Sequence, residues 1–190
     1  MFKPPHEVRA VAGVDVTLRR GQTLGVVGES GSGKSTLGRA ILKLTPSSGA
    51  ISFADRDLRP LDRAAMRPLR KQMQLVFQDP FGSLSPRMSV GDIITEGLLV
   101  HAPEIDRKER EARAAQALKD VGLDPAARNR YPHEFSGGQR QRIAIARAMI
   151  LQPAFVVELG MPIVVTSRGL MRETMPVPLY PGFFAGFQEK

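Results

Sequence analysis

Residues 28 to 36 read G-E-S-G-S-G-K-S-T, which is the complete pattern G-x-x-x-x-G-K-[ST] of a phosphate-binding loop. The residues before it, Thr23 to Val27, read as a buried strand, and those after it, Lys34 to Leu44, carry apolar side chains at helical spacing. The motif requires a strand, a glycine-rich loop and a helix in this order. A chance match in a surface loop would lack both flanking elements, so the sequence predicts a site for nucleotide phosphates.

The residue types within the loop fit that chemistry. Glycines let the main chain approach an anion closely, so that backbone N–H groups converge on a phosphate. Lys34 supplies a charge for the β and γ phosphates, and Ser35 supplies a hydroxyl that can bind Mg²⁺. We predict ATP and Mg²⁺ as cofactors, Ser35 as a metal ligand, and these nucleotide-binding residues: Gly28, Glu29, Ser30, Gly31, Ser32, Gly33, Lys34, Ser35 and Thr36.

A second anion site is predicted where Ser136, Gly137, Gly138 and Gln139 spell S-G-G-Q at the start of a helix that extends to Ile150. We call these four residues the SGGQ turn. Taken alone, it would read as a serine N-cap followed by a flexible glycine pair. Because the chain already has its own phosphate loop, we expect the SGGQ turn to bind the γ phosphate of ATP held by another copy.

Gln78 closes a predicted strand, Met73 to Phe77, within the string V-F-Q-D-P. A lone glutamine at a strand end would ordinarily be a structural hydrogen-bonding residue. Its role here depends on the motifs around it.

These motifs, together with R-Y-P-H-E-F-S-G-G-Q-R at residues 130–140, resemble the ATP-binding subunits of ABC transporters, and most closely those of dipeptide and oligopeptide importers. The resemblance runs from about Val8 to about Val157. It implies a homo- or heterodimer with ATP between the subunits, bound to membrane subunits on the cytoplasmic face of the cell membrane. It also implies that Gln78 is a catalytic residue and metal ligand that couples the site to the membrane subunits. The implied cargo is peptides or a related solute such as nickel.

The resemblance implies an α/β fold: a P-loop NTPase core with a parallel sheet, a small antiparallel β part, and a helical insert at about residues 89–135. We expect an ATP-binding domain over residues 1–158 and a degenerate or non-family segment over 159–190, which leaves the core incomplete at its C-terminal end. Alternating apolar residues predict a strand at Val11 to Leu18. Asp106 and Glu109 are spaced as a capping box, and Gly122 is placed as a helix stop.

The sequence departs from the family after the SGGQ helix. The family continues with a strand that ends in an Asp-Glu pair, whereas here Val157 is followed by Glu158-Leu159-Gly160. An internal deletion would place Ser167 where the family has its switch histidine, and a change of reading frame is the alternative. Glu158 would have to slip along its strand to act as a base. We therefore predict nucleotide binding with impaired hydrolysis.

Composition excludes other classes. The 190 residues contain no cysteine, which rules out disulfides and thiolate metal sites. The net charge of +8 is spread through mixed runs, so we expect no nucleic-acid partner. With no apolar run near the roughly 18 residues of a membrane span, we expect a cytoplasmic protein without a span of its own. A small-molecule kinase would leave the SGGQ turn unexplained, and a non-catalytic module or inert fragment remains a further alternative.

Overall fold

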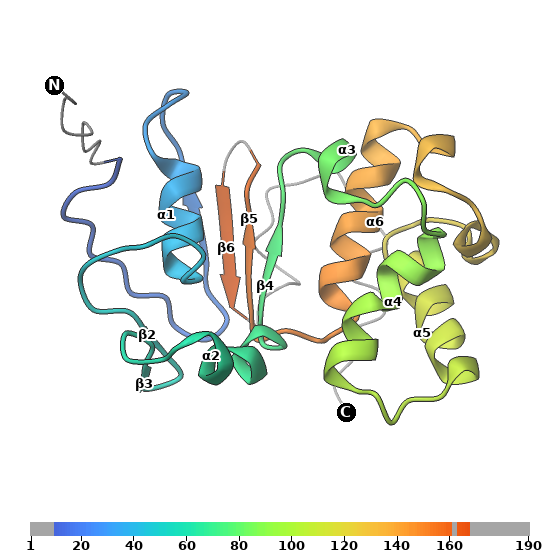
Figure 1. Ribbon diagram of the computed structural model, residues 1–190. Coiled ribbons are helices and arrows are strands. Elements are labelled where there is room, and N and C mark those ends of the chain that lie inside the picture. Colours follow the sequence, from blue (N-terminus) through green and yellow to red (C-terminus); the bar gives the residue numbers. More distant parts are fainter. Residues whose placement is uncertain (1–9, 161–162, 168–190) are drawn as a thin grey trace, which may run out of the picture.

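The computed structural model describes residues 10–160 and 163–167 (Figure 1). Strands and helices are mixed along the chain, as in an α/β protein. In chain order the elements are β1 (Thr23–Val26), α1 (Lys34–Ile41), β2 (Ser52–Phe53), β3 (Arg56–Asp57), α2 (Arg63–Arg70), β4 (Met73–Val76), α3 (Pro80–Ser83), α4 (Val90–His101), α5 (Arg107–Asp120), the 3-10 helices η1 (Pro125–Asn129) and η2 (Pro132–Glu134), α6 (Gly137–Met149), β5 (Phe155–Glu158) and β6 (Ile163–Ser167).

The central sheet has the strand order β1-β6-β5-β4. Strands β4 and β5 pair in parallel, as predicted for the core, whereas β6 pairs antiparallel with both β5 and β1. Strands β1, β5 and β4 therefore point the same way, and their carboxyl ends meet at one edge of the sheet. The phosphate-binding loop follows β1 at this edge, and Gln78 follows β4.

The direction of β6 differs from an all-parallel sheet for a physical reason. Only residues 159–162 separate β5 from β6, and a parallel return needs a crossover of a dozen or more residues. A short connection can only turn the chain back, so β6 enters the sheet against its neighbours. This strand lies beyond the domain boundary that we predicted at residue 158, and yet it occupies a central position between β1 and β5.

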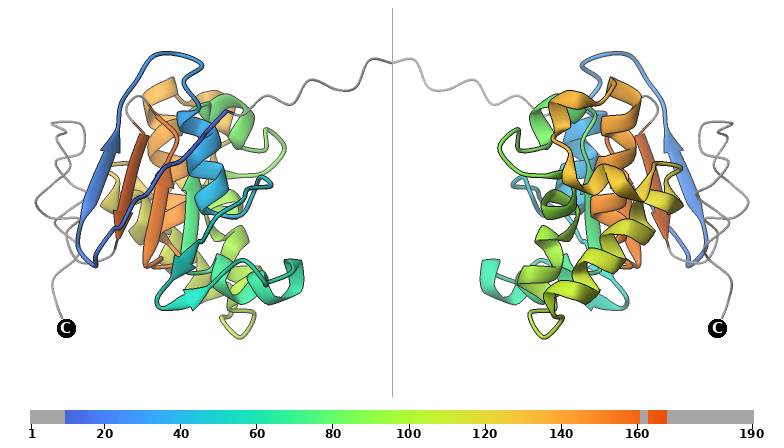
Figure 2. Two further views of the ribbon diagram at one scale, coloured as in Figure 1. Left: turned by 90° about the vertical axis from the view of Figure 1, so that its left-hand side faces the viewer. Right: turned by 90° about the vertical axis from the view of Figure 1, so that its right-hand side faces the viewer.

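Helices cover both faces of the sheet (Figures 1 and 2). Side chains of β5 alternate between these faces, because successive residues of a strand point to opposite sides. Val156 joins the apolar cluster formed with α4, α5 and α6, while Val157 joins the cluster formed with Leu42 and Met66 on the side of α1 and α2. The sheet thus separates α1, which follows the phosphate loop, from α6, which begins at the SGGQ turn.

The predicted helical insert corresponds to α4, α5, η1 and η2. Asp106 caps α5 by accepting a 2.7 Å hydrogen bond from the backbone N–H of Glu109. The other half of the expected capping box does not form, because the Glu109 carboxylate accepts from Arg113 one helical turn later. Gly122 stops the helix as predicted, with a φ of +71° that favours glycine.

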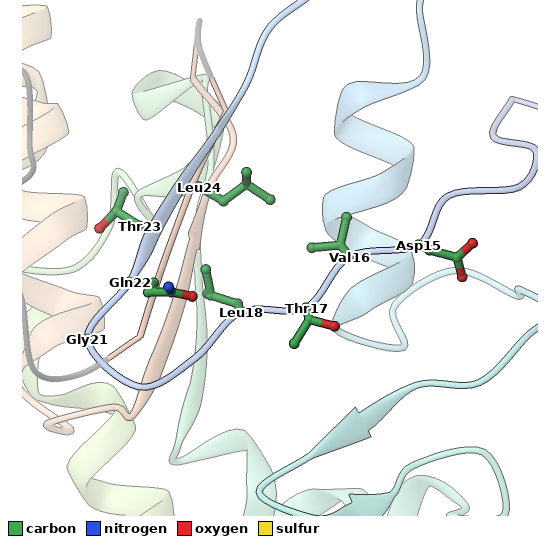
Figure 3. A pocket seen from close by; sticks show the side chains of 8 residues that line it. All are labelled: Asp15, Val16, Thr17, Leu18, Gly21, Gln22, Thr23 and Leu24. Carbon is green, nitrogen blue, oxygen red and sulfur yellow. The ribbon is translucent and has the colours of Figure 1, made fainter.

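The strand predicted at Val11 to Leu18 is absent from the described chain. Val14 and Val16 are each 49% exposed, and the segment passes α1 before turning into β1 (Figure 3). Alternation alone cannot make a strand without a neighbour to accept its hydrogen bonds. The antiparallel β part is instead the hairpin of β2 and β3.

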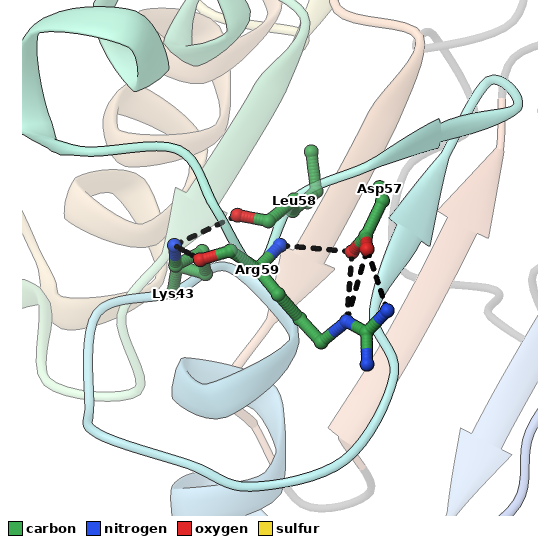
Figure 4. A network of polar contacts seen from close by, with 4 residues as sticks. All are labelled: Lys43, Asp57, Leu58 and Arg59. Carbon is green, nitrogen blue, oxygen red and sulfur yellow. Dashed lines mark hydrogen bonds and ion pairs between the residues drawn. The ribbon is translucent and has the colours of Figure 1, made fainter.

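Helix α1 ends at Ile41, three residues earlier than predicted, and Lys43 adopts a left-handed φ of +51°. The Lys43 ammonium donates to the carbonyl oxygens of Leu58 at 2.7 Å and Arg59 at 3.0 Å (Figure 4). It also donates to the carbonyl oxygen of Leu61 at 2.7 Å. Arg70 donates to the carbonyl oxygens of Leu42 and Lys43. These contacts fasten the C-terminal end of α1 to the loop after β3 and to α2.

Candidate functional site

The phosphate-binding loop connects β1 to α1 at the carboxyl edge of the sheet. The Lys34 ammonium lies against this loop, where it donates to the carbonyl oxygens of Gly28 at 2.7 Å and Glu29 at 2.5 Å and to Ser32 Oγ at 3.3 Å. Gly33 has a φ of +88°, and a Cβ there would lie 2.1 Å from the carbonyl oxygen of Ala10. Backbone conformation and lack of space therefore both require glycine at residue 33.

The N-terminus of α1 is prepared for an anion. Among the described α-helices of eight or more residues, α1 alone receives no capping side chain, whereas Asp62, Ser89, Asp106 and Ser136 cap α2, α4, α5 and α6. The first N–H groups of a helix have no partners within the helix, and its dipole favours negative charge at this end. Phosphate oxygens fit this position and the adjacent Lys34 charge.

Close packing of α1 on β5 sets the position of Ser35. Gly38 is buried, and a Cβ at this residue would lie 2.7 Å from Leu159 Cδ2 and 3.0 Å from Val157 Cγ1. The absence of a side chain lets the helix backbone approach the strand directly. Ser35, almost one turn earlier on the same helix, is thereby held close to the end of β5.

The two predicted metal ligands line one cavity. Ser35 from α1 and Gln78 from the residues after β4 face a space of about 370 Å³, whose full lining is Ser35, Arg39, Phe77, Gln78, Asp79, Gly82, Ser83 and Leu159. A hydroxyl and an amide carbonyl are oxygen ligands of the kind that Mg²⁺ accepts. In the described part of the chain no group of three or more His, Cys, Asp or Glu residues could hold a metal on its own. The bound phosphates and water would have to supply the remaining ligands.

Sequence reasoning missed three polar residues of this cavity. Arg39 lies one helical turn after Ser35, so the i, i+4 spacing on α1 could have indicated it. Asp79 directly follows Gln78, and its carboxylate accepts a 3.2 Å hydrogen bond from the N–H of Gly82. No sequence signal pointed to Ser83.

Glu158 lies at the correct edge of the sheet but faces the wrong side for catalysis at Ser35. Its Oε1 accepts a 3.0 Å hydrogen bond from Gln141 Nε2 on α6. The next residue, Leu159, contacts α1 and lines the cavity with Ser35 and Gln78. The residue just after β5 thus presents an apolar side chain to the predicted metal site, while the last residue of the strand directs its carboxylate to the opposite face.

The deletion alignment placed Ser167 at the position of the family's switch histidine, and the structure contradicts that placement. Ser167 pairs with Phe155, the first residue of β5, while its neighbour Thr166 pairs with Thr23, the first residue of β1. It therefore lies at the amino-terminal edge of the sheet, opposite the phosphate loop. The antiparallel entry of β6 is the cause.

The SGGQ turn forms a reciprocal N-cap on α6. Gln139 N–H donates to Ser136 Oγ at 3.3 Å, and Ser136 N–H donates to Gln139 Oε1 at 2.9 Å. Ser136, Gly138 and Gln139 are exposed, and a Cβ at Gly138 would meet nothing within 4 Å. The turn does not line the Ser35–Gln78 cavity, so the structure leaves it open to another molecule.

The carboxylate of Glu134 braces the chain just before the SGGQ turn. It accepts from the backbone N–H of Tyr131 at 2.7 Å and from Arg130 Nε at 3.0 Å. These bonds, the one from Tyr131 first, lower the pKa of Glu134 below its ordinary value. The charged carboxylate is therefore the form that holds this turn.

A larger cavity of about 520 Å³ lies beside the start of β1 and contains none of the predicted site residues (Figure 3). Its lining is Asp15, Val16, Thr17, Leu18, Gly21, Gln22, Thr23 and Leu24. Asp15 is the one ionisable group in that lining. This space offers no acid–base pair and no cluster of cations.

A P-loop core that carries an exposed S-G-G-Q turn at the start of a helix defines an ATP-binding cassette. A family model described as "ABC transporter" matches residues 11–157, and the chain belongs to that family. In the part of the chain that the structure describes, no helix combines the length and apolar character needed to cross a membrane.

The similar curated proteins are transport ATP-binding proteins. "Peptidoglycan transport ATP-binding protein YejF" of Agrobacterium fabrum is 63% identical over 79% of this chain and 28% of its own length. "Di/tripeptide transport ATP-binding protein DppF" of Pseudomonas aeruginosa is 48% identical over 83% of this chain and 49% of its own. "Oligopeptide transport ATP-binding protein OppF" of Salmonella typhimurium is 46% identical over 82% of this chain and 47% of its own length. The chain thus spans between about a quarter and a half of these relatives.

Solved structures of ATP-binding cassettes share the fold. A dimeric post-hydrolysis state of the cassette MJ0796 bound to ADP and Pi has a TM-score of 0.71 and 29% identity, and covers 78% of this chain and 65% of that one. CbiO1 from Clostridium perfringens has a TM-score of 0.65 and 29% identity, and the match covers 78% of this chain and 58% of that one. The predicted fold class, a P-loop NTPase of the ABC type, is confirmed.

Proposed function

We propose that this chain is the nucleotide-binding part of the ATP-binding subunit of an ABC importer for peptides, and that it binds MgATP but hydrolyses it poorly. One observation carries the proposal: Ser35 and Gln78 line a common cavity beside a helix N-terminus that no side chain caps. Two of the relatives have names that refer to di/tripeptide and oligopeptide transport, and these names support the choice of cargo. The name of a third relative refers to peptidoglycan transport.

In this proposal the loop from Gly28 to Gly33 and the start of α1 hold the ATP phosphates, and Lys34 leaves its carbonyl partners to face them. Ser35 and Gln78 would hold Mg²⁺, which when bound neutralises phosphate charge and orients the transferred group. Leu159 cannot ligate a metal or polarise water. Poor hydrolysis follows, because a positioned acid–base group typically contributes about 10² to 10⁴ in rate.

The exposed SGGQ turn would complete the site of a second ATP-binding subunit, either another copy or a related chain. Dimeric cassettes among the structural neighbours support that role. Membrane subunits would bind near Gln78, where Phe77 is 39% exposed and Arg39 is also exposed. The subunit would then work at the cytoplasmic face of the membrane, held there by its partners.

Replacing Lys34 tests the nucleotide site. We expect Lys34→Ala to abolish MgATP binding in equilibrium dialysis, because it removes the charge beside the uncapped end of α1. Lys108→Ala is the matched control, since Lys108 is exposed on α5 and its loss should leave the affinity unchanged. Equal affinities of the Lys34→Ala and wild-type chains would contradict the assignment.

A further inference from the structure

Arg147 is a partly buried cation that lies outside the predicted site. It belongs to α6, where its neighbours Ile143, Ala144, Ala146 and Ala148 are buried in the apolar cluster around α4 and α5. Its Nη1 donates a 2.6 Å hydrogen bond to the carbonyl oxygen of Ser83, a residue 64 positions earlier in the chain. We call this contact the Arg147 clamp.

The partly buried position of the Arg147 guanidinium disfavours its charged form. Burial lowers the pKa of Arg147 below its ordinary value, and Glu96 on α4 opposes that shift. Replacing buried ionic groups by apolar side chains of similar volume is often neutral for stability. An apolar residue at this position of α6 would avoid the cost of burying a charge. We therefore explain the guanidinium by its hydrogen bond to the carbonyl oxygen of Ser83.

Ser83 is the last residue of α3, a helix of four residues that begins just after Gln78 and Asp79. Both Ser83 and Gln78 line the cavity that contains Ser35. Helix α3 packs against α6, and at its start the Asp79 carboxylate accepts from the N–H of Gly82. So short a helix depends on contacts outside itself, and the Arg147 clamp supplies a charge-assisted one at its far end.

We infer that Arg147 is a positioning residue: through the Ser83 carbonyl it holds the segment that carries Gln78 against α6. The role in nucleotide binding rests on the proposed function. The same helix begins with the SGGQ turn eleven residues earlier, about 16 Å away at the helical rise. The Arg147 clamp thus fixes the Gln78 side of one nucleotide site relative to the turn that would complete another.

Two measurements on the full chain test this inference with the variants Arg147→Met and Arg147→Lys. The first is hydrogen–deuterium exchange of the amides at residues 82–84 without nucleotide. Loss of a charge-assisted hydrogen bond should raise exchange there about tenfold in Arg147→Met. Arg147→Lys keeps the charge and should restore part of the protection. If Arg147→Met does not fold, the amides at residues 82–84 must still exchange faster in Arg147→Lys than in the wild type, because lysine lacks the planar guanidinium group.

The second measurement is ATP affinity with Mg²⁺ and with EDTA. In EDTA we expect Arg147→Met to bind ATP with wild-type affinity, because the phosphate-binding loop is unchanged. With Mg²⁺ we expect this variant to lose most of the increase in ATP affinity that the metal gives the wild type. A merely structural role would lower both affinities together. Arg142→Met is the control, because Arg142 lies on the same helix and Nη1 reaches the Gly122 carbonyl at 3.5 Å, away from the cavity.

Unchanged exchange at residues 82–84 in both Arg147 variants would overturn the inference, as would an equal loss of affinity with and without Mg²⁺. The exchange result decides the existence of the Arg147 clamp without any nucleotide. A wild-type chain that binds no MgATP would instead overturn the proposed function.

Discussion

At the scale of single residues, the two-residue period of β5 determines which chemistry reaches the nucleotide site. Leu159 points toward α1 and lines the cavity with Ser35, whereas Glu158 points toward α6 and accepts from Gln141. A carboxylate one position later, at residue 159 just after the strand, would face the predicted metal site. The sequence contains the right type of group, but on the wrong face of the sheet.

Glu158→Gln is predicted to leave ATP turnover unchanged and to stabilise the fold slightly. Gln141 Oε1 is buried and has no hydrogen-bond partner in the described part of the chain. A glutamine at residue 158 would add an N–H donor for that oxygen and remove a partly buried charge. We expect the free energy of unfolding, measured by urea denaturation, to rise by about 0.5 to 1 kcal/mol.

Phosphate release by the same variant separates this interpretation from a catalytic role. If turnover falls strongly in Glu158→Gln while the fold remains intact, Glu158 acts as the base after all. Gln141→Leu is the matched control, since it removes the hydrogen bond to Glu158 without changing the carboxylate.

At the scale of elements, β6 anchors the strand that precedes the phosphate loop. It pairs with β1 on one side and with β5 on the other, so it joins the strand before the phosphate loop to the rest of the sheet. In the described part of the chain β1 has no other strand neighbour. The segment after the family region therefore contributes directly to the nucleotide-binding core.

Val165→Pro should destabilise the fold by about 1 to 3 kcal/mol, because proline removes an N–H from a central strand and leaves the carbonyl oxygen that it served without a donor. Val165 lies opposite Leu24 of β1 and Val157 of β5. Thr17→Pro is the control, since residue 17 belongs to no strand, and we expect a much smaller loss. Thermal unfolding followed by circular dichroism measures both, and equal losses would contradict the central position of β6.

The motifs fix their own local structure, and this explains which elements could be predicted. The strand, loop and helix around Lys34, the cap at Ser136 and the stop at Gly122 all follow from local residue chemistry and were predicted within a few residues. The direction of β6 and the missing strand at residues 11–18 depend on which strands become neighbours. Alternating side chains indicate which face of a strand is buried, but they do not indicate which strand it pairs with. The sequence therefore could not predict the direction of β6 or the absence of a strand at residues 11–18.

The candidate site divides in the same way. Lys34 and the SGGQ turn were indicated by local spacing, and the structure places them at the N-termini of α1 and α6. The meeting of Ser35, Gln78 and Leu159 at one cavity depends on α1 packing directly on β5 through Gly38. Such a contact between distant segments has no signature within either segment.

At the scale of the whole molecule, the sheet keeps the two predicted phosphate sites apart. The phosphate loop precedes α1 on one face, and the SGGQ turn precedes α6 on the other (Figure 1). A nucleotide in the loop would therefore need the SGGQ turn of a second subunit to enclose it. With Leu159 in the cavity and Ser167 at the opposite edge, an enclosed nucleotide should persist as ATP.

The most direct test of MgATP binding without turnover is to recover the nucleotide from the full chain after incubation with radiolabelled MgATP. We expect nucleotide to be retained by the wild-type chain, lost in Lys34→Ala, and recovered as unhydrolysed ATP. Retained label recovered as ADP within a few minutes, or no retained label at all, would contradict it.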